Sequence, residues 1–279
     1  GIMVIGGVAG VLTLPLLPAD MSPFLVVLLT ILAAALAGMV YSLLLAFASI
    51  NLKADQTIGG TALNLLATAI AVVIAKYFSD SGSAKLNYSN KPFLFSIGGL
   101  ELSVFVPLGI ILLIISYVVL YKTRFGLRLR ACGEHPQAAD SVGINVKWYK
   151  YLHICLGCGI MGIGGYYMSL NMSGSFNSSC WINGYGWIAV ALVIFANWNP
   201  ALAILGTFVF GFFNTLRVSG GSLAAAFPDT LGWLGAVPSQ LYQALPFIIT
   251  AIVLVATSIR QKGSGQPAGL GLNYFREER

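Results

Sequence analysis

The stretch PFLVVLLTILAAALAGMVYSLLLA, residues 23–46, contains no charged side chain. An α-helix rises 1.5 Å per residue and needs about 20 apolar residues to cross the roughly 30 Å hydrocarbon core of a bilayer. The run also lacks the alternation of apolar and polar residues that is typical of a barrel strand. It therefore predicts a membrane-spanning helix.

The chain as a whole is also strongly apolar. The 279 residues are 57% hydrophobic and only 9% charged, whereas soluble domains carry roughly a quarter charged residues. Glycine and proline inside such runs are tolerated where neighbouring helices cover the freed backbone groups. The sequence predicts an all-α, polytopic transmembrane helical bundle of about eight spans in the cell membrane. The expected spans are residues 1–17, 23–46, 57–78, 102–121, 148–170, 185–197, 199–217 and 240–258.

Two polar regions interrupt or follow these spans. Residues 1–259 are expected to form one transmembrane domain with a cytoplasmic loop at 122–147, and residues 260–279 a flexible cytoplasmic tail rich in glycine and charge. The span at 185–197 is short, and Trp198-Asn199-Pro200 leaves little room for a turn. It is expected either to span the membrane or to be re-entrant or broken.

The positions of the basic residues along the chain distinguish two interpretations of the positive charge, a nucleic-acid partner and an orientation signal in the membrane. The net charge is +6, and a cytoplasmic loop at 122–147 puts most of the lysines and arginines on one side of the membrane. This asymmetry is the positive-inside rule, so no nucleic-acid partner is expected, and anionic lipid headgroups are. The cytoplasmic set is Lys53, Lys122, Arg124, Arg128, Arg130, Lys147, Lys150, Arg260, Lys262, Arg276 and Arg279, whereas Lys76, Lys85, Lys91 and Arg217 fall at or beyond the other surface.

The residue types that carry catalysis or ion coupling are sparse. Cys155 and Cys158 lie one turn apart in an apolar span, and no second pair completes a metal site, so buried inert thiols are expected. Every acidic residue falls in a loop or at a span end, which argues against an enzyme and against a proton- or sodium-coupled carrier. No phosphate-binding G-x-x-x-x-G-K-[ST] loop occurs. Energy for any transport is expected to come from a partner.

The polar stretch TRFGLRLRACGEHPQAADSVGINV, residues 123–146, is predicted to contain a short helix. Its arginines follow an apolar span and are expected to anchor in the headgroups. Pro136 suits the first position of a helix and Gly143 the residue just past its end. A helix of about two turns is unstable alone and needs a partner surface, for which Ala138, Ala139 and Val142 provide a narrow face of small side chains. The alternative is a loop that only caps the bundle.

The spacing in this stretch resembles the cytoplasmic coupling loop of ABC-importer permeases for simple sugars, nucleosides and branched-chain amino acids. The family pattern, aromatic-Gly-x-x-x-Arg-Ala-x-Gly-x-x-x-x-Ala-Ala-x-x-x-Gly-Ile, is matched over residues 125–144. IGGTALNLLATAI at 58–70 and INGYGWIAVALVIFANWNP at 182–200 agree with the resemblance, although Tyr185 stands where the family often has a charged residue. Only Gly1-Ile2-Met3 resembles the family's opening, so its first span is expected to be missing.

The resemblance implies a mechanism and a set of partners. The short helix would dock on a cytoplasmic ABC ATP-binding subunit, which uses ATP and Mg while this chain binds no cofactor or metal and is not an enzyme. A second permease chain and an extracytoplasmic solute-binding lipoprotein would complete the importer. The residues implied in ATPase coupling are Phe125, Gly126, Arg130, Gly133, Glu134, Pro136, Ala138, Ala139 and Gly143.

The substrate is expected to be neutral, because no charged residue is placed in the middle of a span. Amides in spans are expected to face one another or a water-filled cavity, and aromatic rings either stack on a base or sugar or form the interfacial belt. The nearest branch is the nucleoside branch linked to basic membrane lipoproteins; ribose- or galactose-type sugars and riboflavin are the alternatives. A channel or scaffold is the remaining class and would need no docking helix. The candidate pathway residues are Asn64, Asn183, Tyr185, Trp187 and Asn214.

Overall fold

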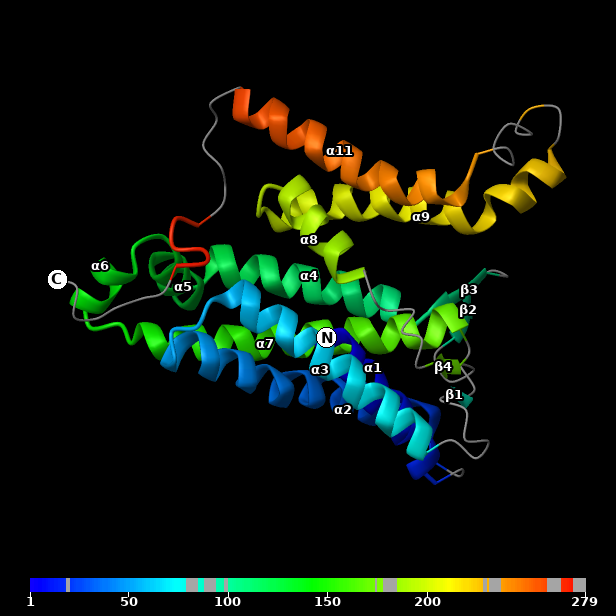
Figure 1. The fold of residues 1–279 in the computed structure, drawn as a ribbon, viewed down its shortest axis with the longest axis horizontal. Coiled ribbons are helices and arrows are strands. Elements are labelled where there is room, and N and C mark those ends of the chain that lie inside the picture. The colour runs from blue at the N-terminus through cyan, green and yellow to red at the C-terminus, as the bar shows by residue number, and fades with distance from the viewer. Residues whose placement is uncertain are drawn as a thin grey trace. The chain divides into compact units, whose positions relative to one another are not determined.

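The computed structural model describes residues 1–18, 21–78, 85–87, 94–97, 100–173, 175–177, 185–227, 230, 237–259 and 267–272. These residues form two compact units, one of residues 1–183 with 268–279 and the other of residues 184–267. Each unit is built almost wholly of helices, as the sequence predicts (Figure 1).

The first unit contains seven α-helices and four short strands among its described residues. The strands pair antiparallel, β1 with β4 and β2 with β3. The helices are α1 (Ile2–Leu16), α2 (Pro23–Ala46), α3 (Gln56–Tyr77), α4 (Phe105–Lys122), α5 (Arg124–Glu134), α6 (Pro136–Ser141) and α7 (Val146–Ser173), with a π-helical turn η1 (Phe47–Asn51) after α2. The strands are β1 (Lys85–Asn87), β2 (Leu94–Ile97), β3 (Leu100–Ser103) and β4 (Ser175–Asn177).

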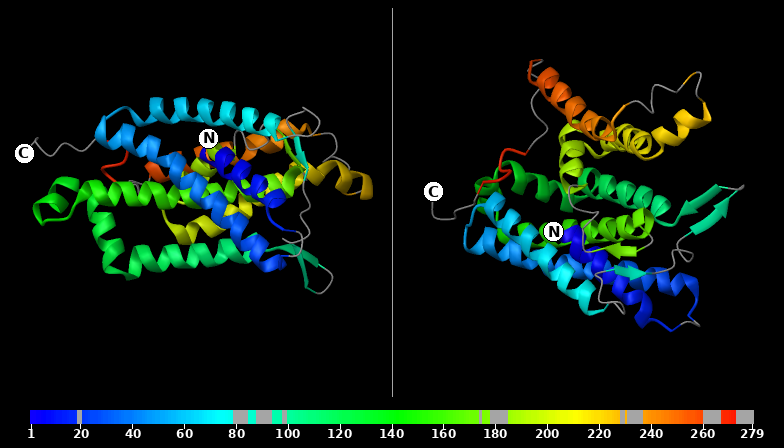
Figure 2. Two further views of the ribbon diagram at one scale, coloured as in Figure 1. Left: turned by 90° about the horizontal axis from the view of Figure 1, so that it is seen from below. Right: turned by 45° about the vertical axis from the view of Figure 1, so that its right-hand side comes forward.

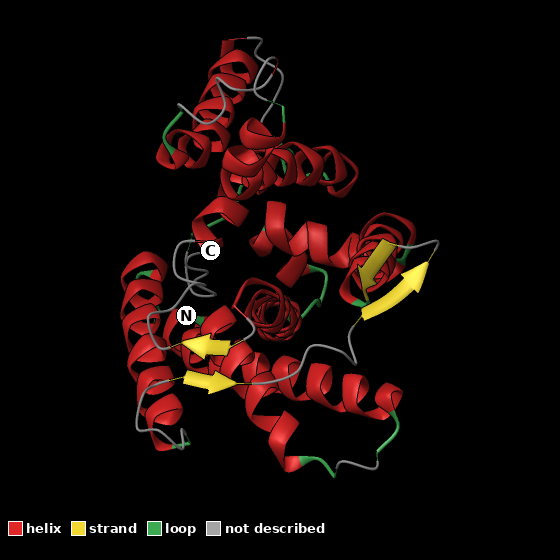
Figure 3. Cartoon of the chain, turned by 90° about the vertical axis from the view of Figure 1, so that its right-hand side faces the viewer, coloured by secondary structure: helices red, strands yellow, loops and turns green. Residues whose placement is uncertain are grey.

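The polar connections of this unit separate into two ends. The strand pairs, yellow in Figure 3, lie at one end of the long helices, and α5, α6 and the η1–α3 turn lie at the other (Figure 1). At this second end, the Tyr151 hydroxyl near the start of α7 donates to Asn51 Oδ1 of η1 at 3.1 Å. The predicted cytoplasmic lysines and arginines of residues 1–183 therefore gather at one end, whereas Lys76 and Lys85 lie toward the strands.

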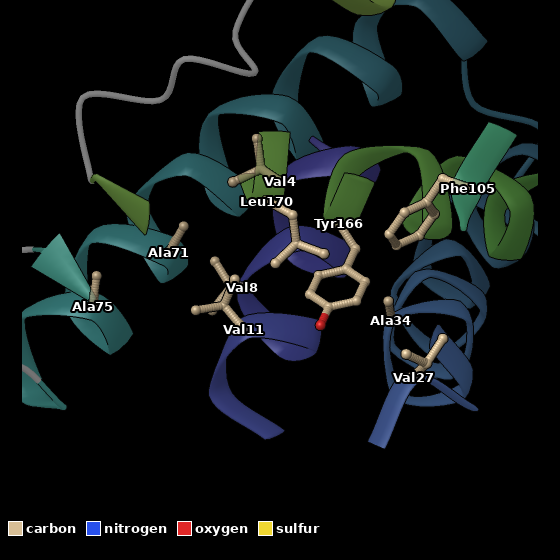
Figure 4. Close-up of a cluster of buried hydrophobic side chains, with 10 residues drawn as sticks. All are labelled: Val4, Val8, Val11, Val27, Ala34, Ala71, Ala75, Phe105, Tyr166 and Leu170. Carbon is tan, nitrogen blue, oxygen red and sulfur yellow. The ribbon is translucent and has the colours of Figure 1, made fainter. Parts of the chain in front are cut away.

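Helices α1, α2 and α7 pack closely because glycines line their contacts. A Cβ on Gly162 would collide with the Ala34 carbonyl of α2, and one on Gly165 with the Met3 carbonyl of α1. Small residues let membrane helices approach in this way. Around these contacts lies a buried core drawn from five helices, shown in Figure 4: Val4, Val8, Val11, Val27, Ala34, Ala71, Ala75, Phe105, Tyr166 and Leu170.

The second unit consists, in its described part, chiefly of α8 (Tyr185–Phe195), α9 (Pro200–Ala226) and α11 (Ser239–Ile259). A tight turn joins α8 to α9, and Asn197 and Trp198 both adopt positive φ there, at 49° and 55°. Asn199 then caps α9, since its Oδ1 accepts the Ala201 N–H at 3.0 Å, and Pro200 fills the first helical position. Figure 2 gives further views of these helices.

Helices occur at all eight predicted span positions, with different ends at some of them. Among the described residues, three helices are long and apolar enough to cross a membrane, namely Pro23–Asn51, Gln56–Tyr77 and Phe105–Lys122, and α9 is a fourth if its two segments, bent by 60°, form one broken span. Helix α4 begins at Phe105 and not at residue 102, because residues 100–103 pair with β2. Helix α9 continues past residue 217 to Ala226.

Candidate functional site

The corner between α4 and α5 is a closely packed joint. The Thr123 hydroxyl donates to the Val119 carbonyl at 2.6 Å and accepts the Gly126 N–H at 3.1 Å, so one side chain ends α4 and caps α5. Gly126 is buried against the Val119 and Leu120 carbonyls, where a Cβ would collide with both. The family-pattern glycine at 126 is thus required by the close approach of two backbones.

A cation–π contact supports the same corner from the outside. The Arg130 guanidinium lies over the Tyr121 ring, 5.1 Å from its centroid, and Tyr121 stacks on Tyr117 with centroids 5.2 Å apart. Arg130 remains exposed. It therefore joins α5 to α4 while leaving its polar edge accessible.

Helices α5 and α6, here called the α5–α6 pair, share a small apolar core with the start of α7. Phe125 lies 5.3 Å from both the Tyr149 and the His153 rings, measured between centroids. His153 Nδ1 lies 2.7 Å from the Tyr149 carbonyl oxygen and must donate to it. The α5–α6 pair is therefore packed against α7 as well as against α4. The core residues are Cys132, Ala139, Val146 and Tyr149, with Phe125, Leu129 and Ile144 packed against them.

The ends of α6 follow the sequence prediction. Pro136 occupies the first helical turn, and Gly143 adopts φ +81° just past the last turn. The Gly143 N–H donates to the Asp140 carbonyl at 3.0 Å and the Ile144 N–H to the Ala139 carbonyl at 3.1 Å. These two bonds form a Schellman motif, in which a left-handed glycine satisfies the free carbonyls of a helix end.

The predicted docking face of α6 needs a correction at Ala139. Ala138 is exposed and Val142 is 78% exposed, but Ala139 is only 2% exposed and belongs to the core shared with α7. The outer surface of the pair instead carries polar and apolar side chains of both helices. Its exposed members include Leu127, Arg128, Arg130, Glu134, Ala138 and Val142.

Helix α5 itself is the element that sequence reasoning missed, since its arginines were assigned to a membrane-anchoring flank. The signal was the helical spacing of Phe125, Leu129 and Cys132, which turn to one face. Burial raises the pKa of the Cys132 thiol, so it stays protonated and acts as a small apolar side chain. Among the described residues no three His, Cys, Asp or Glu side chains cluster as a metal site.

The C-terminal segment contacts the α5–α6 pair. Residues 268–271 form a turn, the Gly269 N–H donates to the Gly133 carbonyl at 2.8 Å, and the Ala268 N–H donates to Glu134 Oε2 at 3.3 Å. The expectation of a wholly flexible tail is therefore wrong for residues 267–272. The remainder of the tail lies outside the described residues.

The candidate pathway residues are divided between the two units, with Asn64 in the first and Tyr185, Trp187 and Asn214 in the second. Asn64 lies in α3, with its amide oxygen 2.6 Å from the Gly1 nitrogen. Tyr185 begins α8 and is half-buried, Trp187 is 66% exposed, and Asn214 is half-buried in α9. Asn183 lies outside the described residues.

Sequence similarity identifies the family of the chain. The family model described as the permease component of the branched-chain amino acid transport system matches residues 1–256. The chain belongs to this permease family. With its apolar helices, the permease is a multi-pass protein of the cell membrane and one component of a larger ABC transport system.

Three relatives cover most of the permease. A nucleoside ABC transporter permease protein of Lactococcus lactis is 36% identical over 100% of this chain and 87% of its own length. A guanosine ABC transporter permease protein of Bacillus subtilis is 33% identical over 90% of this chain and 78% of its own. A putative glucose ABC transporter permease protein of Haloferax volcanii is 30% identical over 86% and 78%. No solved structure matches the permease.

Proposed function

We propose that this permease is the membrane subunit of an ABC importer that moves nucleosides or related neutral solutes into the cytoplasm by alternating access. The observation that carries the proposal is the α5–α6 pair. It is a packed helical element between two long apolar helices, with an exposed outer face and tight joints to α4 and α7. Such an element transmits a rigid-body displacement, which a loop without packing would absorb.

In this proposal the energy comes from a cytoplasmic ATP-binding subunit that docks on the outer face of the pair. That subunit holds ATP and Mg, and the permease contributes no catalytic residue and binds no cofactor. The exposed residues Arg130, Glu134 and Ala138 would contact the partner directly. Phe125, Gly126, Gly133, Pro136, Ala139 and Gly143 would keep the pair in shape, because the structure buries them or uses them at helix ends.

The nucleoside assignment is supported by two relatives whose names give nucleosides or guanosine as cargo. It also agrees with the absence of acidic residues from the predicted spans, since a neutral solute needs no charged partner there. The proposed pathway residues are Asn64, Asn183, Tyr185, Trp187 and Asn214. A simple sugar is the second candidate, because one relative is a putative glucose permease.

Two further partners complete the proposed importer. A second permease chain, identical or different, would form the other half of the pathway. An extracytoplasmic solute-binding lipoprotein would deliver the solute to the outer end of the permease.

The test is to purify the tagged permease with its associated proteins, reconstitute the complex into vesicles, and measure ATP hydrolysis with nucleosides, glucose, ribose and riboflavin. We expect an ATP-binding subunit to co-purify and nucleosides to raise the hydrolysis rate when the binding protein is present. Stimulation by a sugar alone would transfer the assignment to the second candidate. Recovery of no ATP-binding subunit would refute the importer and favour a channel or scaffold.

A further inference from the structure

We propose that residues 267–272, here called the C-terminal clip, seat on the junction of α5 and α6 and hold the two helices at a fixed angle. The inference rests on the proposed function in one respect: the fixed angle is what lets the pair pass a displacement to the spans. The clip's seating on the pair can be tested separately from transport.

The junction between α5 and α6 is a single residue. His135 is both the residue after α5 and the residue before α6, with φ −136° and ψ 79°, and no side-chain hydrogen bond caps α6 there. The His135 N–H donates to the Ala131 carbonyl at 2.9 Å and the His135 carbonyl accepts the Ala139 N–H at 3.0 Å. Cys132 and Ala139 also pack in one core. A contact that bridges the two helix ends from outside adds to these bonds and limits bending at His135.

The clip supplies that connection through a carbonyl at the end of α5. The last carbonyls of a helix have no partner within the helix and are satisfied by other groups or by water. Gly133 is in the last turn of α5, and its carbonyl accepts the Gly269 N–H at 2.8 Å. The clip thus acts as a C-terminal cap contributed by a segment more than 130 residues away in the chain.

Glu134 adds a second hydrogen bond to the clip. A carboxylate at a helix C-terminus is unfavourable beside the negative end of the helix dipole. Here Oε2 accepts the Ala268 N–H at 3.3 Å, which places a backbone donor beside the charge. The position of Glu134 at the end of α5 is therefore used to hold the clip.

The fit of the clip depends on glycine. A Cβ on Gly269 would lie 2.7 Å from the Gly133 carbonyl oxygen and 3.8 Å from Pro136 Cδ, so the clip touches the end of α5 and the first residue of α6 together. Gly271 adopts φ +77°, which turns the clip back on itself. The clip spans the junction and leaves no space for a side chain at 269.

The first experiment measures backbone deuterium exchange in the purified complex for the wild type, Gly269→Val and Ala268→Val. The two valines are of equal size, but residue 268 is exposed and keeps its N–H, whereas residue 269 has no room. We expect exchange at residues 131–137 and 267–272 to rise on the order of tenfold in Gly269→Val and to stay near wild type in Ala268→Val. Equal exchange in all three proteins would overturn the contact.

The second experiment measures solute-stimulated ATP hydrolysis and solute uptake per ATP for the same proteins and for Gly269→Ala. We expect Gly269→Val to lose most of the stimulation while the ATP-binding subunit still co-purifies, and Gly269→Ala, whose Cβ alone meets the Gly133 carbonyl, to lose part of it. Gly269→Ala keeps the test valid if Gly269→Val fails to fold. Raised exchange with unchanged stimulation would overturn the coupling role of the clip, whereas a wild-type complex without stimulation would refute the proposed function and leave the contact to be judged by exchange.

Discussion

At the scale of single residues, neighbouring alanines of α6 have opposite environments. Both match the family pattern, and the sequence places both on one small-residue face. The structure exposes Ala138 and buries Ala139 against Cys132, Val146 and Tyr149. Residues i and i+1 lie about 100° apart around a helix, so the side that faces α7 takes one of them. Which one could not be inferred without the position of α7.

Leucine substitutions at these two alanines should have different effects. Ala139→Leu adds volume to a filled core and is expected to destabilise the protein by about 1–3 kcal/mol. Ala138→Leu adds volume to an exposed site, so stability should change by less than about 0.5 kcal/mol while solute-stimulated ATP hydrolysis falls. Thermal unfolding followed by thiol labelling, with hydrolysis measured in parallel, separates the two outcomes. Equal stability of the two variants would contradict the burial of Ala139.

Asp55 gives a prediction that depends on pH. Its carboxylate accepts the Ile58 and Thr57 N–H groups at the start of α3, and these bonds lower its pKa. A lowered pKa in the folded state means that the stabilisation is complete above the usual carboxyl value of about 3.9 and is lost as the pH falls through the lower folded value. We expect deuterium uptake at residues 56–60 to rise in that acid range relative to Asp55→Asn. Asparagine also caps helices but does not titrate there, so parallel uptake in both proteins would refute the prediction.

At the scale of elements, the length of each apolar run predicts where a helix occurs. It predicts less well where the helix ends and which element it packs against. The runs at 23–46 and 57–78 gave α2 and α3 nearly to the residue, because only an unbroken helix hides the backbone in hydrocarbon. Helix α5 was missed because its exposed arginines conceal a narrow apolar face. Helix α4 starts late because Leu100–Ser103 finds a strand partner, which local composition does not reveal.

The glycines of α7 allow a matched comparison within one helix. Gly162 faces the Ala34 carbonyl and Gly38, whereas a Cβ on Gly157 meets nothing within 4 Å. Gly162→Ala should cost about 1–3 kcal/mol by forcing α2 and α7 apart. Gly157→Ala should be neutral or stabilising by up to about 1 kcal/mol, since alanine favours the helix. Unfolding in detergent gives both values, and a tolerated Gly162→Ala would contradict the close contact.

At the scale of the whole molecule, the distribution of lysine and arginine predicts how the chain is oriented in the membrane. The contacts between helices define its compact units. Within the first unit, the basic residues predicted to be cytoplasmic gather at the end that carries the α5–α6 pair. The single transmembrane domain expected for residues 1–259 stays a prediction, and within it the contacts gather in two compact units that divide after residue 183. Hydropathy does not show such a division, because every span is apolar whichever neighbour it packs on.

Orientation can be measured with a thiol reagent that does not cross membranes. On a Cys180→Ser background, Lys85→Cys should react in intact cells, and Lys122→Cys should react only after the membrane is opened. The reason is that Lys85 begins β1, at the end of the unit that carries the strands, whereas Lys122 ends α4 beside α5 at the other end. Labelling of Lys122→Cys in intact cells would reverse the assigned orientation and remove the α5–α6 pair from the reach of any cytoplasmic ATPase.

Helix α4 is fastened to α7 at both of its ends. At Lys122 the connection runs through α5, and at the opposite end Phe105 lies 5.2 Å from the Tyr167 ring. Its 18 residues span about 27 Å at 1.5 Å per residue, close to the thickness of the hydrocarbon core. A hydrogen-bonded helix hardly changes length, so we expect a displacement of about an ångström at the Lys122 end of α4 to move Phe105 and the paired strands β2 and β3 by a similar amount.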